Sequence, residues 1–130
     1  MCIRDRSLCA LSANFGTDDE DSMSRPFGVA LLVAGHDADE GYQLYHTDPS
    51  GTFVSYSAKA IGSGSEGAQT TLQEEYRPDM TMEEAETLAL STLKAVMEEK
   101  VSTINVDMAS VAPKYKVYDK EAIKAIIERL

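Results

Sequence analysis

Residues 62–67 have the spacing of a nucleotide-binding loop. Their sequence, Gly-Ser-Gly-Ser-Glu-Gly, fits the pattern GxGxxG, in which glycines let the backbone approach a pyrophosphate. A dinucleotide site also needs a parallel βαβ unit and an acidic ribose partner about 20 residues further on. Here a hairpin is expected before the loop, and the helix expected at 66–77 leads into another helix. We therefore expect a tight strand-to-helix turn, with Ser65 capping the helix and Glu66 at its positive end. A small nucleotide-binding module is kept as an alternative.

Two histidines could act as general bases in a Ser-His-Asp arrangement. His36 and Asp37 fall in a polar segment that we expect to be a turn between strands, and His46 leads into a second turn that starts at Asp48. The sequence contains no Gly-x-Ser-x-Gly elbow, no Walker loop and no cysteine pair with zinc spacing. Both histidines are expected to be surface or hairpin residues, and no catalytic or cofactor-binding residue is assigned.

Two other sets of residues could bind a metal ion, and two cysteines could pair in a disulfide. The acidic sequence 16–24 contains four consecutive acids, but a calcium loop needs ligands at fixed alternate positions, a central glycine and a closing glutamate. Met82 and Met97 have helical spacing, which favours packing over ligation. Cys2 and Cys9 are expected to be free thiols in a reducing compartment. We expect a solvated loop at 16–24 and assign no metal ligand or cofactor.

The charge of the chain limits the classes of partner. Twelve basic residues stand against 22 acidic ones, which gives a net charge of -10. Phosphate neutralisation needs clustered lysines and arginines, and here they are scattered, so DNA and RNA are not expected as partners. No apolar run reaches the length of a membrane span, so no membrane association is expected. We expect a cytoplasmic and nuclear location.

Three apolar runs predict an antiparallel meander. Residues 27–33 are apolar at almost every position, which favours a strand covered on both faces and lying deepest in the sheet. Residues 42–46 alternate apolar and polar side chains. The Asp-Pro-Ser-Gly sequence at 48–51 is a turn signal, and residues 52–61 return with Phe53, Val54 and Tyr56.

Two helices are expected after the meander. The helix at 66–77 should end before Pro78, because proline restricts the residue that precedes it. Thr81 and Glu84 have the spacing of a capping box at the start of the next helix. One stripe of that helix is expected to be core, namely Ala89, Leu90, Leu93, Val96 and Met97.

The last third of the chain predicts one or two strands and a helix. Apolar side chains alternate with other residues along 104–112, which favours a strand that Pro113 terminates. A second, short strand is expected at 115–118. The helix at 119–130 should have Asp119 as its N-cap. Its apolar face is Ala122, Ile123, Ile126, Ile127 and Leu130, with Lys120, Lys124, Glu128 and Arg129 outside. Strands followed by helices, without βα alternation, indicate an α+β fold.

Three sequences carry a family resemblance: Arg-Pro-Phe-Gly-Val at 25–29, Asp-Pro-Ser-Gly at 48–51 and Gly-Ser-Gly-Ser-Glu-Gly-Ala at 62–68. In this order they resemble the α-type subunits of the 20S proteasome. The resemblance implies the second half of an N-terminal-nucleophile hydrolase αββα sandwich, with antiparallel sheets between helix layers. It also implies a non-catalytic ring subunit that supports ubiquitin-dependent protein degradation. The implied partners are neighbouring α subunits, β-ring subunits and, through the complete ring, a regulatory particle.

The part of the chain that the resemblance covers sets the expected domain boundaries. Residues 1–6, Met-Cys-Ile-Arg-Asp-Arg, look like translated sequencing adapter, so we expect a non-native peptide there. Residues 7–130, beginning with the end of a helix at 7–15, should be the C-terminal part of one α-subunit domain. The gate-forming tail and the activator pocket would then belong to the preceding half. We also expect the doubly apolar strand at 27–33 to leave a core-like sheet face exposed in the chain alone.

A threonine peptidase related to the β subunits of the same particle is the main alternative. Such subunits use an N-terminal Thr whose own amino group is the base, whereas this chain begins with Met-Cys. Residues 62–65 match a β-subunit Gly-Ser-Gly-Ser, and Glu99 and Ser102 fall where those subunits carry Asp-x-x-Ser. Because Glu99 replaces the aspartate, and the serines are expected to hold turns, no catalytic residue is assigned.

Overall fold

The computed structural model describes residues 28–111 and 114–130. The chain divides into two compact units, Met1–Ser57 and Ala58–Leu130, and each is described by itself. Several expectations lie outside the described residues, namely those for Cys2, Cys9, the adapter-like residues 1–6, the helix at 7–15, the acidic sequence 16–24 and Pro113.

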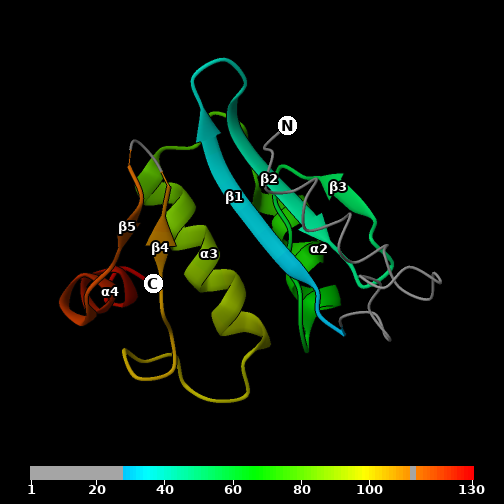
Figure 1. The fold of residues 1–130 in the computed structure, drawn as a ribbon. Coiled ribbons are helices and arrows are strands. Elements are labelled where there is room, and N and C mark those ends of the chain that lie inside the picture. The colour runs from blue at the N-terminus through cyan, green and yellow to red at the C-terminus, as the bar shows by residue number, and fades with distance from the viewer. Residues whose placement is uncertain (1–27, 112–113) are drawn as a thin grey trace, which may run out of the picture. The chain divides into compact units, whose positions relative to one another are not determined.

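Within its described residues, 28–57, the first unit contains a three-stranded antiparallel meander (Figure 1). Strands β1 (Leu31–Asp37), β2 (Gly41–Thr47) and β3 (Phe53–Ser55) lie in the order β1-β2-β3. Leu31 is opposite Thr47 in the β1–β2 register, and Thr47 is opposite Phe53 in the β2–β3 register. The predicted meander is therefore confirmed.

Strand β1 differs from the prediction in extent and position. It was expected at 27–33 as the deepest strand, but it begins at Leu31 and lies at the sheet edge, while β2 is central. Leu31 and Leu32 are 37% and 38% exposed. His36 was expected in a turn, yet it is paired with Tyr42, because residues 38–40 and the positive φ of Gly41 (74°) suffice to reverse the chain.

The turn between β2 and β3 follows its sequence signal. The Asp48 carboxylate accepts hydrogen bonds from the backbone N–H groups of Ser50 (2.9 Å) and Thr52 (3.1 Å). Gly51 has φ 81° and donates its N–H to the Asp48 carbonyl at 3.1 Å. The Asp48 side chain thus accepts backbone hydrogen bonds within the turn in place of a main-chain carbonyl, as Asp side chains commonly do.

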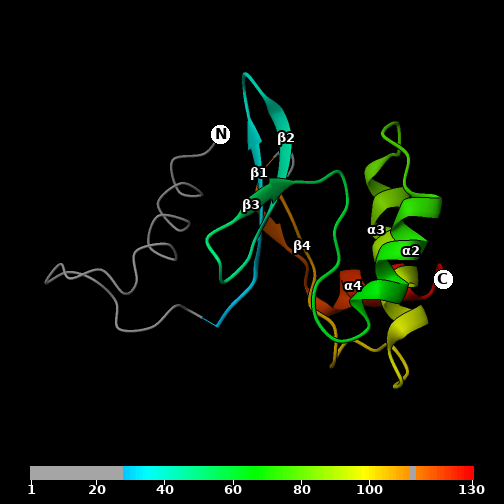
Figure 2. The same cartoon turned by 90° about the vertical axis from the view of Figure 1, so that its right-hand side faces the viewer.

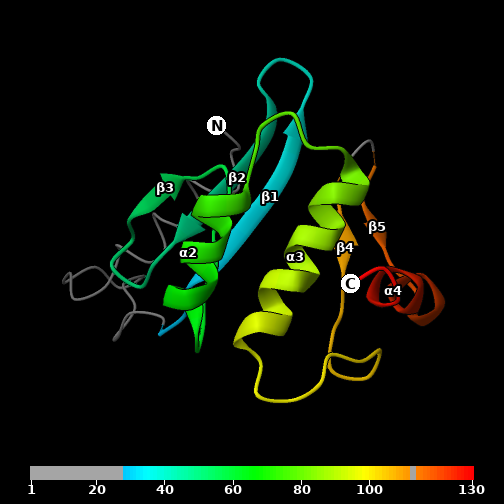
Figure 3. The same ribbon diagram turned by 180° about the vertical axis from the view of Figure 1, so that it is seen from behind.

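The second unit contains three helices and a two-stranded antiparallel sheet. Its elements are α2 (Ser65–Glu75), α3 (Met82–Val96), β4 (Ala109–Ser110), β5 (Lys116–Val117) and α4 (Lys120–Ile127). Helices α2 and α3 lie side by side (Figures 2 and 3). The core packs Leu90 of α3 against Ile126 of α4, together with Val101 and Val106 from the segment between α3 and β4.

Helix α4 confirms its predicted cap and apolar face. The Asp119 carboxylate accepts the Ala122 N–H at 2.7 Å, and Ile123 and Ile126 are 1% and 2% exposed. This short helix is amphipathic enough to be held by burial of one face. An antiparallel sheet in each unit, with the helices α2, α3 and α4 in the second, confirms the predicted α+β class.

One packing prediction in the second unit, the buried stripe of α3, is wrong. The α3 stripe does not form one buried face: Leu88, Leu90 and Thr92 are buried, whereas Ala89 is exposed and Leu93 is 38% exposed. Helix α3 contacts α2 on one side and α4 on another, so its buried residues fall on two faces.

The strand predicted at 104–112 is reduced to Ala109–Ser110. Residues 103–105 form a turn, and Ile104 is 88% exposed. The alternation that suggested a strand instead places Val106 and Met108 against the core on an irregular segment. The expected short strand at 115–118 is present as β5, paired with β4, and Tyr118 donates its N–H to the Met108 carbonyl at 2.9 Å.

Candidate functional site

The glycine-rich loop forms a tight entry into α2. Gly62 and Gly64 have φ values of 102° and 77°, and Ser65 donates its N–H to the Gly62 carbonyl at 3.2 Å. The N-cap is Gly64, and no side chain accepts a hydrogen bond there. Ser65 is therefore the first helical residue and not the predicted cap, because a left-handed N-cap can be adopted by glycine without strain. Glu66 lies in the first turn of α2, as predicted.

The loop glycines also serve helix packing. A Cβ built at Gly64 would lie 3.3 Å from Cβ of Val96, at the end of α3, and one at Gly67 would lie 3.6 Å from Cγ1 of Val96. The start of α2 can therefore approach the end of α3 this closely at Gly64 because that position carries no side chain, whereas Gly67 leaves room for one. The GxGxxG spacing has a structural cause that requires no bound nucleotide.

The two candidate histidines lie in the meander and contact aromatic rings. The His36 ring is 4.7 Å from the Tyr42 ring, centroid to centroid, and the His46 ring is 6.2 Å from the Tyr56 ring. The hydrogen bond from the Ser50 hydroxyl is the main cause of the lowered pKa of Asp48. The Asp48 carboxylate is thus hydrogen-bonded within its own turn. Among residues 28–111 and 114–130 no serine is hydrogen-bonded to either histidine, and the contacts of His36 and His46 are those of sheet residues.

Glu99 and Ser102, the candidates from the β-subunit pattern, lie in a connecting segment. Ser102 donates its N–H to Oδ1 of Asn105 at 2.8 Å, and its hydroxyl lies 3.1 Å from the same oxygen. The Asn105 amide donates to the Lys100 carbonyl at 3.1 Å. Ser102 therefore holds a turn, and Glu99 is exposed to solvent.

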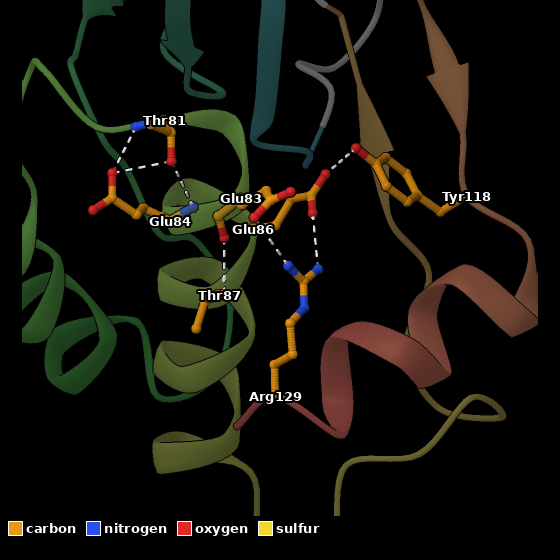
Figure 4. Close-up of polar contacts among 7 residues, drawn as sticks. All are labelled: Thr81, Glu83, Glu84, Glu86, Thr87, Tyr118 and Arg129. Atoms are coloured by element: carbon orange, nitrogen blue, oxygen red, sulfur yellow. Dashed lines mark hydrogen bonds and ion pairs between the residues drawn. The ribbon is translucent and has the colours of Figure 1, made fainter.

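Sequence reasoning missed a polar cluster that joins α3 to the two ends of α4 (Figure 4). Tyr118, just before α4, donates its hydroxyl hydrogen to one oxygen of Glu86, and Arg129, just after α4, lies 3.5 Å from the other oxygen. A second Arg129 nitrogen lies 3.7 Å from Glu83. Arg129 was predicted to lie on the outer face of the last helix, and its Glu86 partner is 43 residues earlier in the chain. No local pattern could have identified that partner.

The Tyr118 hydroxyl is the group most affected by this cluster. Its hydrogen bond to Glu86 raises the pKa of Tyr118, and burial and the negative charge of Glu86 act in the same direction. A hydrogen bond with Ser110 opposes the shift. The neutral phenol is therefore favoured, as a donor to a carboxylate requires.

A groove of about 830 Å³ lies next to this cluster. It is formed by the end of α2, the connection to α3, the first turns of α3, and Arg129. The lining residues are Glu74, Glu75, Arg77, Met80, Thr81, Glu83, Glu84, Thr87, Leu88, Ser91 and Arg129. This is a volume typical of ligand pockets.

The predicted capping box closes one end of the groove. The Thr81 N–H donates to the Glu84 carboxylate at 2.8 Å, and the Glu84 N–H donates to the Thr81 hydroxyl at 3.3 Å. The Thr81 N–H contributes most to lowering the pKa of Glu84, the Thr81 hydroxyl, which donates to the same carboxylate at 3.0 Å, comes next, and Arg77 at 3.6 Å adds a smaller effect. The Glu84 N–H in the first turn of α3 is thus already partnered.

Metal ligation and membrane insertion find no support in the part of the chain that the structure describes. No three His, Cys, Asp or Glu side chains converge on a possible ion position within residues 28–111 and 114–130. Across those same ranges no helix combines the length and apolar character that a membrane span requires.

Comparison with known proteins identifies related chains. The family described as "Proteasome subunit" matches residues 10–111. The chain is 52% identical to proteasome subunit alpha type-5 of Dictyostelium discoideum, over 96% of this chain and 54% of that protein. It is 48% identical to the probable alpha type-5 subunit of Schizosaccharomyces pombe, over 95% of this chain and 52% of that protein. It is 47% identical to the alpha type-5 subunit of Drosophila melanogaster, over 96% of this chain and 53% of that protein. The chain spans about half the length of these relatives.

Proposed function

Because the chain belongs to the proteasome subunit family, we propose that it is part of an α subunit, type 5, that acts as a non-catalytic structural member of the 20S core particle. The observation that carries this proposal is the 52% identity to an alpha type-5 subunit over 96% of the chain. The strand start at 25–29, the Asp48 turn and the glycine loop resemble type 5 most among the α-type subunits.

The matched region contains most of the described fold. Residues 10–111 include the whole meander, the glycine turn and the α2–α3 pair. The residues that give the resemblance hold backbone geometry: Asp48 organises a turn, and Gly64 permits the close approach of α2 to α3. This supports a role in which the subunit contributes its shape to an assembly and contributes no reactive side chain.

A catalytic, β-like role receives less support. Ser102 is engaged by Asn105, Ser65 is the first residue of α2, and the related proteins named above are all alpha type-5 subunits. We accordingly assign the chain no nucleophile and no general base. Its mechanism is assembly: α subunits pack side by side in a ring that stacks on a β ring and controls substrate entry.

The proposed partners are neighbouring α subunits, β-ring subunits and, through the complete ring, a regulatory particle. The proposed process is ubiquitin-dependent protein degradation, and the proposed location is the cytoplasm and nucleus. Family membership supports assembly with other proteasome subunits in general; the named neighbours, the process and the location are our proposals.

Tagging the chromosomal copy of the gene tests the function. On native gels of cell extracts, the tagged full-length product should migrate with a particle that hydrolyses a fluorogenic peptide. The full-length subunit purified alone should hydrolyse none. Absence of the tag from the particle, or peptide hydrolysis by the subunit alone, would overturn the proposal.

A further inference from the structure

The groove between α2 and α3 carries an unbalanced charge. Four carboxylates and two guanidinium groups line it, so its net charge is negative by two. Both arginines are engaged: Arg77 lies 3.6 Å from Glu84, and Arg129 contacts Glu83 and Glu86. Glu74 and Glu75 remain, exposed and with no cationic partner among the described residues. The excess negative charge is therefore concentrated at the end of α2.

The position of Glu74 and Glu75 makes this excess stronger. They occupy the last turn of α2, where the helix dipole is already negative, and no basic residue lies in that turn. Helix ends of this kind favour cations, and glutamates there raise the local negative potential further. An external positive charge would relieve both effects.

Two apolar side chains also line the groove. Leu88 is 7% exposed and Met80 is half-buried. Methionine adapts its shape to varied partners, which suits a docking surface. A bare metal ion would leave these side chains without contact, whereas a peptide can place an apolar side chain on them and cationic side chains beside Glu74 and Glu75.

We propose that the α2–α3 groove is a docking site for a partner-protein segment in which lysines or arginines flank an apolar residue. The cationic side chains pair with Glu74 and Glu75, and the apolar side chain contacts Met80 and Leu88. This proposal goes beyond ring assembly, since it depends on the surface of the second unit alone.

Fluorescence anisotropy with the full-length subunit tests the groove. The probe is a fluorescein-labelled peptide of alternating lysine and leucine, and the control probe replaces each lysine by glutamate. Glu74→Gln with Glu75→Gln should weaken binding of the lysine probe about four- to ninefold, at roughly two- to threefold for each exposed charge pair. Added salt should weaken it as well.

A matched control removes the same charge elsewhere. Glu98 and Glu99 are also adjacent, exposed glutamates near a helix end, but they do not line the groove. Glu98→Gln with Glu99→Gln should leave the affinity for the lysine probe unchanged. Equal weakening by both double variants, or equal binding of the glutamate probe, would overturn the proposal.

Zero-length carbodiimide cross-linking gives the location of the probe independently. Cross-links from the probe lysines should map to Glu74, Glu75 or Glu83, and mapping only to acids outside the groove would overturn the proposal. Native gels separate this test from that of the proposed function. A Glu74→Gln, Glu75→Gln subunit should still enter the particle, whereas failure of the unaltered subunit to enter counts against the ring function and not against the groove.

Discussion

Tyr118 donates its hydroxyl hydrogen to the carboxylate of Glu86, 32 residues earlier in the chain (Figure 4). The other oxygen of that carboxylate lies 3.5 Å from Arg129, and the Glu86 side chain is only 12% exposed. Tyr118 precedes α4 and Arg129 follows it, so one carboxylate on α3 holds both ends of the last helix. Buried apolar side chains, among them Leu90 and Ile126, pack α4 against α3. Glu86 adds one polar contact at each end of α4.

Replacing Tyr118 by Phe should destabilise the docking of α4 by about 1–3 kcal/mol. The ring still packs, but one oxygen of a largely buried carboxylate loses its donor. Hydrogen exchange of residues 119–130 in the full-length protein measures the effect. Tyr115→Phe is the control, because Tyr115 is 71% exposed and its change should stay within about 0.5 kcal/mol. Equal loss of protection in the two variants would contradict the role given to Glu86.

The same hydrogen bond predicts a loss of stability at alkaline pH. Because the folded-state pKa of Tyr118 is raised above the usual value near 10, the native state holds that proton more tightly than the unfolded chain does. The resulting stabilisation is complete below the unfolded pKa and is lost as the pH rises through the folded pKa. Ultraviolet difference spectroscopy should show one late-titrating tyrosine, which Tyr118→Phe removes. Its persistence in that variant would assign it to another residue.

Arg129 and Lys124 form ion pairs whose contributions should differ. Arg129→Gln removes the cation beside Glu86, a side chain 12% exposed, and should cost about 1–2 kcal/mol. Lys124→Gln removes a pair with Glu128 at 3.9 Å in which both side chains are about two-thirds exposed, and should cost no more than about 0.5 kcal/mol. Urea unfolding of the full-length variants compares the two. A Lys124 effect equal to that of Arg129 would show that burial of Glu86 is not the deciding factor.

The capping box predicts an acid-dependent effect. Thr81→Ala should destabilise α3 by about 1 kcal/mol near neutral pH, because it removes the side-chain acceptor for the Glu84 N–H. The bonds from Thr81 lower the pKa of Glu84, so this part of the stability is present above the unfolded pKa and is lost as the pH falls through the folded pKa. Urea midpoints of wild type and variant should therefore converge in acid. A difference that stayed constant with pH would exclude the Glu84 carboxylate as its source.

Local signals in the sequence predicted local structure well. The Asp48 turn, the Thr81–Glu84 box and the Asp119 cap each involve residues within four positions of one another, so residue types and spacing define them. The family could be recognised for a related reason, since its most specific sequences lie in such turns and helix entries.

What the sequence could not show depends on distant partners. His36 lies in a strand because β2 continues to pair with it, and strand ends are set by that register. Arg129 faces Glu86, which no pattern near Arg129 reveals. Of the groove, only the capping residues Thr81 and Glu84 were predicted, because its other lining residues come together through the packing of α2, α3 and α4.

The glycines of the loop give a direct test of packing against nucleotide binding. Gly64→Ala should destabilise the protein by about 1–2 kcal/mol or more, because φ is 77° and the new Cβ would lie 3.3 Å from Val96 Cβ. Gly67→Ala should be neutral or stabilising by up to about 1 kcal/mol, because Gly67 is helical and its Cβ would meet Val96 at an ordinary 3.6 Å. Thermal melting of the two full-length variants, with and without added ATP or NAD, separates the two explanations. If the loop serves packing, the variants differ in melting temperature and neither nucleotide shifts any of the curves. A nucleotide-dependent rise in the wild type that both variants lose would instead assign the loop to phosphate binding.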